Sequence, residues 1–241
     1  MDDSLRRRIT ENVASIRDRI AAACGRAGRP PGSVRLVAVT KYVDAAVTRL
    51  IADAGCDDLA ESRPQQLWAK AVTLADRAIP VRWHLVGHLQ RNKVRRTLPY
   101  LGLLQTLDSR RLLDVVEGEA AAASRPCEVL VEVNLAGDPG RSGAMIADVP
   151  GLVAAALEAP HLRLRGLMGM AGHPDSPAAD PRGDFARLRE LRDRLVDVAP
   201  VEALAELSMG MTGDFEQAIL EGATLVRIGS ALVEGTDWPA A

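Results

Sequence analysis

The stretch VRLVAVTK, residues 34–41, decides the fold class of this chain. Its first seven residues are apolar or β-branched apart from Arg35, and such a short run is typical of a strand buried on both faces. The breaker Pro30-Pro31-Gly32 stands before the run, and Lys41 follows it directly. Strands with both faces buried belong to parallel sheets covered by helices, so the stretch predicts an α/β fold.

Helices and strands alternate on both sides of this stretch. Before it, residues 5–20 carry an apolar stripe at intervals of three and four, which predicts an amphipathic helix that ends near Gly25 and Gly28. After it, strands are expected at 57–60, 82–86, 103–107, 128–134, 163–168, 206–209 and 224–228. The intervening helices are expected at 45–54, 64–78, 92–98, after Asp108 or Ser109, and at 149–157, 185–198 and 215–221.

Eight strands, each after the first preceded by a helix, suit a closed α/β barrel of the (β/α)8 TIM type. We predict one such barrel, a single cofactor-binding domain over residues 1–241, with an extra N-terminal helix. An open, doubly wound sheet is the alternative that the same alternation allows. No G-x-G-x-x-G motif follows the first strand to favour that alternative.

The composition is that of an ordinary soluble protein, with 47% hydrophobic and 26% charged residues. A formal net charge of −2 provides no general attraction to nucleic acid. The first residues are charged, and no apolar stretch approaches the roughly 20 residues of a membrane span. Cys24, Cys56 and Cys127 form no disulfide framework, which is typical of the reducing cytoplasm. We therefore expect a cytoplasmic protein with no nucleic-acid or membrane partner.

Lys41 occupies the position where chemistry is expected in a barrel, the carboxyl end of a strand. Its stem would lie in the apolar barrel and its amine at the mouth, where partial desolvation favours the neutral amine that attacks an aldehyde. A lysine that simply extends to solvent is the plain alternative for this residue alone. Polar or unusual side chains also end the other expected strands, namely Glu61, His84, Asn134, Met168, Ser208 and Arg227.

The last two expected strands carry a candidate phosphate site. The segment LSMGM, residues 207–211, follows the seventh strand, and VRIGS, residues 226–230, closes the eighth. Barrels commonly bind phosphate at the loops after these strands. Gly229 and Ser230 would offer backbone N–H groups, and Ser208 and Ser230 hydroxyls, although Gly–Ser turns are also common without a ligand. An amine facing a phosphate cradle across the mouth is what an aldehyde phosphate requires.

Four segments together resemble the pyridoxal phosphate homeostasis protein family. They are VTK at 39–41, WHLVGHLQRNK at 83–93, LSMGMTGDF at 207–215 and VRIGS at 226–230, and they span nearly the whole chain. The resemblance implies a barrel like the N-terminal domain of alanine racemase, a cytoplasmic location, and bound pyridoxal 5'-phosphate without established turnover. It also implies a role in vitamin B6 homeostasis, in which the protein buffers the cofactor or delivers it to apo-enzymes.

The resemblance also implies roles for individual residues. Lys41 would hold the cofactor as a Schiff base, while Ser208, Gly229 and Ser230 would hold its phosphate. Arg227 would face the pyridine nitrogen. Because a guanidinium donates and does not accept, it would leave that nitrogen unprotonated, which makes the ring a weaker electron sink. The remaining candidate contacts are Met168, Met209, Asn134, His84 and Ser62, the last of which stands where the family has asparagine.

Two function classes remain: a non-catalytic carrier, and an enzyme such as an amino-acid racemase. Racemisation by two bases needs a second proton donor, which the related racemases take as a tyrosine from an additional domain. This chain ends soon after the eighth strand. Tyr42 is expected to point away from Lys41, and Tyr100 to lie at the opposite mouth. We therefore expect a monomeric carrier with no catalytic residue.

A metal site is the weakest of the sequence signals. His84 and His88 are four residues apart, but Gly87 lies between them and a strand ends there. A shared helical face is therefore not expected, and no cysteine or carboxylate pair stands nearby to complete a zinc site. We predict no metal.

Overall fold

The computed structural model describes residues 3–78, 80–138, 140–172, 179–196 and 199–236. The strands are β1 (Arg35–Val39), β2 (Asp58–Glu61), β3 (Arg82–Leu85), β4 (Leu101–Leu107), β5 (Cys127–Asn134), β6 (Ala144–Met145), β7 (Leu162–Gly169), β8 (Glu206–Ser208) and β9 (Leu225–Ile228). The α-helices are α1 (Asp3–Arg26), α2 (Ala45–Asp53), α3 (Pro64–Thr73), α4 (Val94–Thr97), α5 (Arg110–Ala122), α6 (Val149–Glu158), α7 (Pro181–Leu195) and α8 (Phe215–Leu220). Short 3-10 turns complete the order as η1 (Pro31–Ser33), η2 (Arg91–Lys93), η3 (Leu98–Tyr100), η4 (Val201–Leu204) and η5 (Ser230–Val233).

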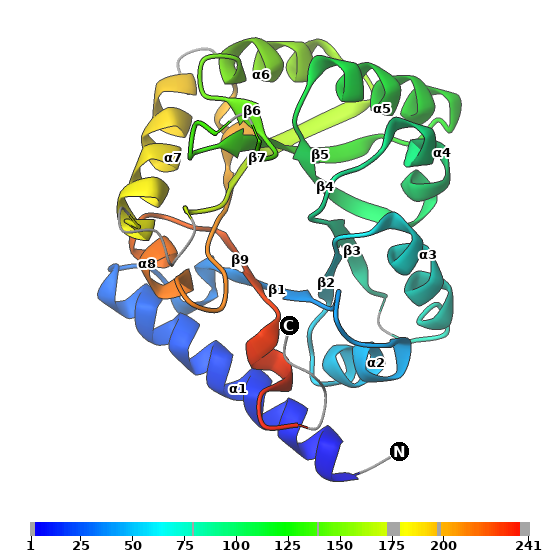
Figure 1. Ribbon diagram of the computed structural model, residues 1–241, viewed down its shortest axis with the longest axis vertical. Coiled ribbons are helices and arrows are strands. Elements are labelled where there is room, and N and C mark those ends of the chain that lie inside the picture. The colour runs from blue at the N-terminus through cyan, green and yellow to red at the C-terminus, as the bar shows by residue number, and fades with distance from the viewer. Residues whose placement is uncertain (1–2, 79, 139, 173–178, 197–198, 237–241) are drawn as a thin grey trace.

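The strands close into a barrel, which confirms the predicted (β/α)8 fold (Figure 1). β1 pairs in parallel with β2 on one side and with β9 on the other, so the first and last strands of the chain are neighbours. The pairing of β4 with β5 completes the ring and excludes the open sheet. β6 was not predicted. It is a two-residue strand that extends the end of β5, too short to leave a periodic pattern in the sequence.

Alternation along the strands separates two layers of core. Val37, Ala60, Leu103, Leu130 and Met168 point into the barrel and contact one another, whereas neighbouring strand residues pack outward against the helices. Polar residues also enter the barrel interior, and each of the most buried among them has a partner described below. The barrel is therefore filled, and its chemistry is confined to its two mouths and to this polar chain.

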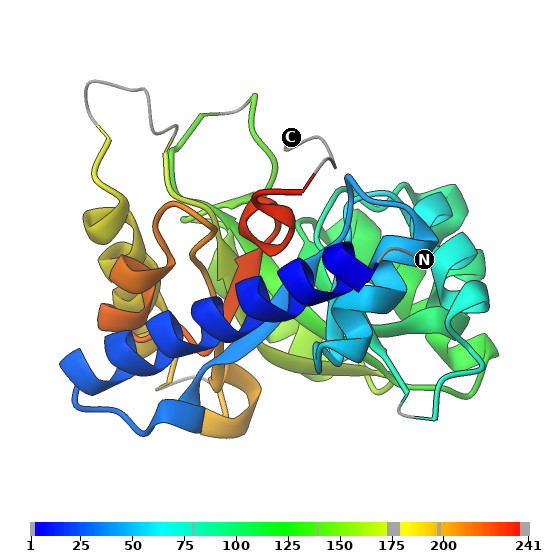
Figure 2. The same ribbon diagram turned by 90° about the horizontal axis from the view of Figure 1, so that it is seen from below.

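The extra N-terminal helix is confirmed and has a clear structural role. α1 buries the predicted stripe, including Ile9, Val13 and Ile16, and lies against α8 and η5 (Figure 2). The Asn12 amide donates to the carbonyl oxygens of Leu232 at 3.2 Å and Glu234 at 2.9 Å. The helix thus holds the segment that follows the last strand, where the phosphate site is expected.

The helix boundaries differ from prediction where proline and capping residues decide them. α3 ends at Thr73 instead of 78, and α7 begins at Pro181, four residues before the expected start, because Asp180 caps it through the backbone N–H of Gly183 at 3.0 Å. The expected end of that helix at 197–198, and residues 173–178 of the loop before it, lie outside the described residues. Within the described part, no helix has the length and apolarity to cross a bilayer.

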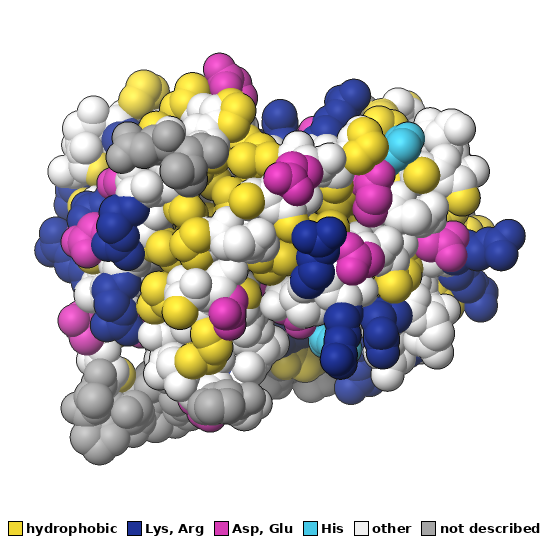
Figure 3. Space-filling view, turned by 90° about the horizontal axis from the view of Figure 1, so that it is seen from above, with side chains coloured by type: hydrophobic (Ala, Val, Ile, Leu, Met, Phe, Trp, Pro, Cys, Tyr) yellow, Lys and Arg dark blue, Asp and Glu magenta, His cyan; other side chains and the backbone are white. Residues whose placement is uncertain are grey.

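The surface carries charges of both signs. On the face drawn in Figure 3, Lys and Arg side chains stand among Asp, Glu and apolar ones. Many of these charges form exposed ion pairs, such as Arg110 with Asp114. Such pairs contribute little to stability but they divide the surface into small patches of alternating sign.

Candidate cofactor site

A pocket of about 270 Å³ opens at the carboxyl ends of the strands. Its lining comes from the ends of several strands and from the loops that follow them, as expected for a barrel. The lining residues are Val39, Lys41, Tyr42, Ser62, Val86, Met170, Met211, Thr212, Gly213, Arg227, Gly229 and Ser230. Lys41, Ser62, Arg227, Gly229 and Ser230 are thus brought together as the sequence predicted.

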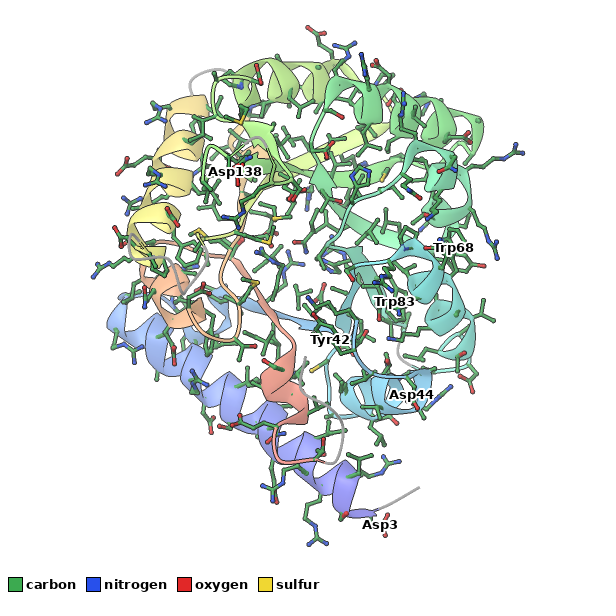
Figure 4. All side chains as sticks on the ribbon, viewed as in Figure 1. Asp3, Tyr42, Asp44, Trp68, Trp83 and Asp138 are labelled. Carbon is green, nitrogen blue, oxygen red and sulfur yellow. The ribbon has the colours of Figure 1, made fainter. Side chains whose placement is uncertain are left out.

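Lys41 lies in a turn two residues beyond the end of β1 and is half-buried. Among the residues that the structure describes, it has no hydrogen bond or ion pair. Its Nζ atom lies 4.5 Å from the centre of the Tyr42 ring. The expectation that Tyr42 points away is wrong, because the strand ends at Val39 and the turn brings both side chains to the pocket. Figure 4 shows Tyr42 toward the centre of the barrel and Asp44 outward at the start of α2.

The backbone before Lys41 is held from below by a buried ion pair. Lys70 of α3 donates to Glu61 at the end of β2 and, at 2.7 Å, to the carbonyl oxygen of Thr40. The Thr40 hydroxyl donates to the same Glu61 carboxylate at 2.7 Å. Lys70 and Glu61 are both buried, so this carboxylate is structural rather than a cofactor ligand. Ser62, the next residue, turns to the pocket.

Arg227 forms the floor of the pocket on β9. Its guanidinium is 4% exposed and donates to the Ser208 hydroxyl at 2.7 Å and to the Gly169 carbonyl oxygen at 2.9 Å. Burial lowers the pKa of Arg227 to about 10, although the negative charges of Asp214 and Glu132 oppose that effect. The side chain therefore stays charged at neutral pH, in a fixed orientation, with further N–H groups available.

The opposite end of the pocket is a cradle of small residues from two loops. The Gly229 N–H approaches the Thr212 hydroxyl at 3.5 Å, and a Cβ on Gly229 would meet the Val39 carbonyl oxygen at 3.3 Å. The loop that carries Thr212 turns at Gly210, whose φ of +90° favours glycine. Asp214 accepts from the Met211 N–H at 2.6 Å and so closes the turn. The arrangement presents backbone N–H groups and hydroxyls to an anion.

The sequence analysis missed Thr212 and Gly213 as members of this cradle. They belong to the segment LSMGMTGDF, but attention there fell on Ser208, the residue at the strand end. Ser208 is fully buried, and its hydroxyl donates to Gln105 at 2.7 Å while it accepts from Arg227. Both of its bonding directions are used below the pocket. The expected Ser208 contact with phosphate is therefore replaced by a contact with Arg227.

Four other candidate residues do not line the pocket. Met168 belongs to the barrel interior, whereas Met209 packs outward between sheet and helices. His84 is fully buried and bound to Asp58 and Gln105. The Asn134 amide donates to the carbonyl oxygens of Asp138 at 2.7 Å and Arg141 at 3.3 Å, so it closes the loop after β5.

The two histidines of the rejected metal motif point to different environments. The His84 side chain is fully buried, while the His88 side chain is 65% exposed and lies 3.7 Å from Asp108. No group of three His, Cys, Asp or Glu side chains with metal-binding geometry occurs in the described parts of the chain.

The fold and the pocket together define a class: a closed α/β barrel with an amine, a buried guanidinium and an anion cradle at one mouth. The model of the alanine racemase N-terminal domain matches residues 11–237. A pyridoxal phosphate homeostasis protein of Pseudomonas aeruginosa is 39% identical over 232 residues, which cover 96% of this chain and 97% of that protein.

Solved structures give the same result. An unknown protein from Bifidobacterium adolescentis superposes with a TM-score of 0.88 at 36% identity, covering 96% of this chain and 97% of that one. PipY of Synechococcus elongatus PCC7942, determined without PLP, gives a TM-score of 0.83 at 33% identity and covers 93% and 99%. A second PipY structure has PLP bound. The chain belongs to the alanine racemase N-terminal domain family and, within it, to the pyridoxal phosphate homeostasis proteins.

Proposed function

We propose that this protein binds pyridoxal 5'-phosphate at the pocket described above and serves in the homeostasis of that cofactor. The observation that carries the proposal is the placement of Lys41, Arg227 and the Thr212–Gly229 cradle around one cavity of about 270 Å³. The name of the P. aeruginosa relative and the PLP-bound structure of PipY support it. The whole chain then acts as one cofactor-binding domain in the cytoplasm, as a monomer that supplies apo-enzymes.

The residues present fit the chemical groups of the cofactor. Lys41 offers an amine to the aldehyde and would hold the cofactor as a Schiff base. Arg227 would donate to the ring nitrogen, since a guanidinium has only donors. Thr212, Gly229 and Ser230 would hold the phosphate, and the close approach of Val39 to Gly229 leaves no room there for a side chain. Ser62 and Met170 line the remaining wall.

The arrangement favours a carrier over a racemase. When bound, the cofactor supplies an electron sink, and a charged Arg227 opposite the ring nitrogen weakens that sink. A racemase also needs proton donors on both faces of the ring. Tyr42 is the tyrosine of the pocket, but its ring lies 4.5 Å from the Lys41 amine, beside that lysine and not across from it. Racemisation or elimination of amino acids well above a Lys41→Ala control would contradict the carrier.

The lysine content makes the test of cofactor binding unusually direct. The chain has three lysines: Lys41, Lys70 and Lys93. Lys70 is buried against Glu61, so only Lys41 and Lys93 compete for the aldehyde among the side chains. We expect an absorbance band in the visible after incubation with pyridoxal phosphate, its loss on borohydride reduction, and a phosphopyridoxyl group on the peptide that contains Lys41. Lys93→Ala is the matched control and should label like the wild type. Labelling at Lys93 alone, or no band, would refute the proposal.

A further inference from the structure

A chain of hydrogen bonds crosses the inside of the barrel from the pocket to the opposite mouth. Arg227 donates to Ser208 at 2.7 Å, and Ser208 donates to the Gln105 side-chain oxygen at 2.7 Å. The Gln105 amide nitrogen lies 2.8 Å from Nδ1 of His84, and Nε2 of His84 lies 2.7 Å from Asp58. All but Asp58 are buried to 96% or more. Five strands contribute one residue each, so the chain exists only in the closed barrel.

The two ends of the chain determine the position of every hydrogen between them. Arg227 has only donors, so the Ser208 oxygen must accept from it. At the other end a carboxylate only accepts, so Nε2 of His84 must carry the hydrogen that faces Asp58. Nδ1 of a neutral His84 is then an acceptor, which orients the Gln105 amide with its nitrogen toward His84 and its oxygen toward Ser208. All four bonds consequently donate in one direction, from Arg227 to Asp58.

The surroundings of His84 favour the neutral ring that this pattern requires. Burial lowers the pKa of His84 and outweighs the opposing effect of Asp58. Burial by itself would raise the pKa of Asp58, but the hydrogen bond from His84 and the charges of Arg35 and Arg82 lower it. A neutral histidine beside an ionised carboxylate is the pair that lets the hydrogen lie on Nε2.

We infer that His84 and Gln105 are positioning residues for the cofactor, and that they act through Ser208 to hold the Arg227 guanidinium as a donor toward the ring nitrogen. This inference rests on the proposed binding of pyridoxal phosphate. Ser208 and the Gly169 carbonyl take one N–H from each terminal nitrogen of Arg227, so the guanidinium cannot rotate without breaking both bonds. Its remaining N–H groups are left for the pocket.

The first test reads the hydrogen position without any cofactor. In 15N-labelled wild-type protein, long-range 1H–15N spectra distinguish the two neutral forms of each of the four histidines. Assignment of His84 comes from the loss of its signals in His84→Gln. We expect His84 to be neutral, with the hydrogen on Nε2, from pH 6 to pH 8. A hydrogen on Nδ1, or a charged ring at pH 7, would overturn the direction of the chain.

The second test separates positioning from general loosening of the barrel. Pyridoxal phosphate is compared with its 1-deaza analogue, in which a carbon replaces the ring nitrogen and removes the acceptor. We expect the wild type to prefer the natural cofactor by about 10-fold or more, the effect of one hydrogen bond to a charged group. Gln105→Met and Ser208→Ala should lose most of that preference, whereas loosening would weaken both ligands equally.

Matched controls make each outcome decisive. Thr97→Val removes another fully buried hydroxyl, one that lies between helices outside the barrel, and should keep the wild-type preference. If the wild type shows no preference, or if Gln105→Met and Ser208→Ala both retain it, the inference fails although cofactor binding stands. If Lys41 is not labelled at all, the proposed function fails, and the His84 measurement still decides the direction of the chain.

Discussion

The two mouths of this barrel are built on opposite plans. At the amino ends of the strands, Arg35 pairs with Glu206, Arg82 pairs with Glu128, and Asp58 lies within 4.0 Å of both arginines. At the carboxyl ends, Lys41 has no ion pair among the described residues, and glycine-rich loops expose backbone N–H groups. One mouth cancels its charges and stabilises the ring of strands. The other leaves an amine and an anion cradle to bind a ligand, which is how barrels commonly divide stability and function.

The sharpest way to separate the mouths is Lys41→Ala. We expect complete loss of borohydride-stable cofactor incorporation, because the other lysines are buried or outside the pocket. The midpoint of thermal unfolding should stay within about 2 °C of the wild type, since a half-buried lysine without partners contributes little to stability. Mass spectrometry and calorimetry measure the two effects. A large fall in the melting temperature would show that the carboxyl mouth is structural as well.

Lys70→Met should have the largest effect on stability. It leaves the Glu61 carboxylate, which is fully buried, without its cation. Breaking a buried pair from one side costs about 3–5 kcal/mol, or roughly 6–20 °C in a chain of this size. Because Lys70 also holds the Thr40 carbonyl, cofactor affinity should fall too. The double variant Lys70→Met/Glu61→Gln should recover part of the stability, and its failure to do so would argue against an unpaired charge as the cause.

Arg35→Met tests the amino-end mouth alone. It removes the partner of Glu206 and one of the cations near Asp58, but these groups are partly exposed and water screens them. We expect a loss of about 1–2 kcal/mol, seen as a fall of roughly 2–8 °C, with cofactor affinity unchanged. Weaker cofactor binding without further loss of stability would show that the two mouths are coupled more strongly than this comparison assumes.

The smallest effect is expected from Glu132→Gln near the carboxyl mouth. Burial raises the pKa of Glu132, which is 2% exposed and accepts from the Ser142 hydroxyl at 2.6 Å. The folded state therefore resists ionisation of this group, and the cost appears as pH rises above the unfolded pKa of about 4.3 and through the folded value. Glutamine removes that cost, so the variant should unfold at a slightly higher temperature than the wild type at pH 8. The difference should vanish below about pH 4.

Much of the fold was predictable because buried parallel strands leave continuous apolar runs. Residues 34–41 and 128–134 show this most clearly, and the strands β1 and β5 coincide with them to within a residue or two. β6 escaped prediction because two residues carry no period. The start of α7 depended on Asp180 as a cap, a local signal that a broad search for apolar stripes passes over.

The pocket was predictable only in part, because a strand end does not reveal which residue beyond it turns inward. Lys41, Arg227 and Gly229 were placed correctly by the strands that carry them. Ser208 and Tyr42 were not, since the first ends its strand inside the barrel and the second follows a turn rather than a continued strand. The link from Gln105 to Ser208 joins residues 103 positions apart. Only the register of the closed barrel brings them into contact.

The small number of lysines sets how the protein would act on the free cofactor. With one accessible amine in the pocket and another buried in an ion pair, each chain would take up one cofactor molecule. A one-to-one binder holds a free concentration steady only near its own dissociation constant, and its total capacity equals the amount of protein present. On the proposed function, the cell would therefore adjust its reserve of the cofactor by changing the abundance of this chain, and adjust the level that is defended through the affinity set at Lys41.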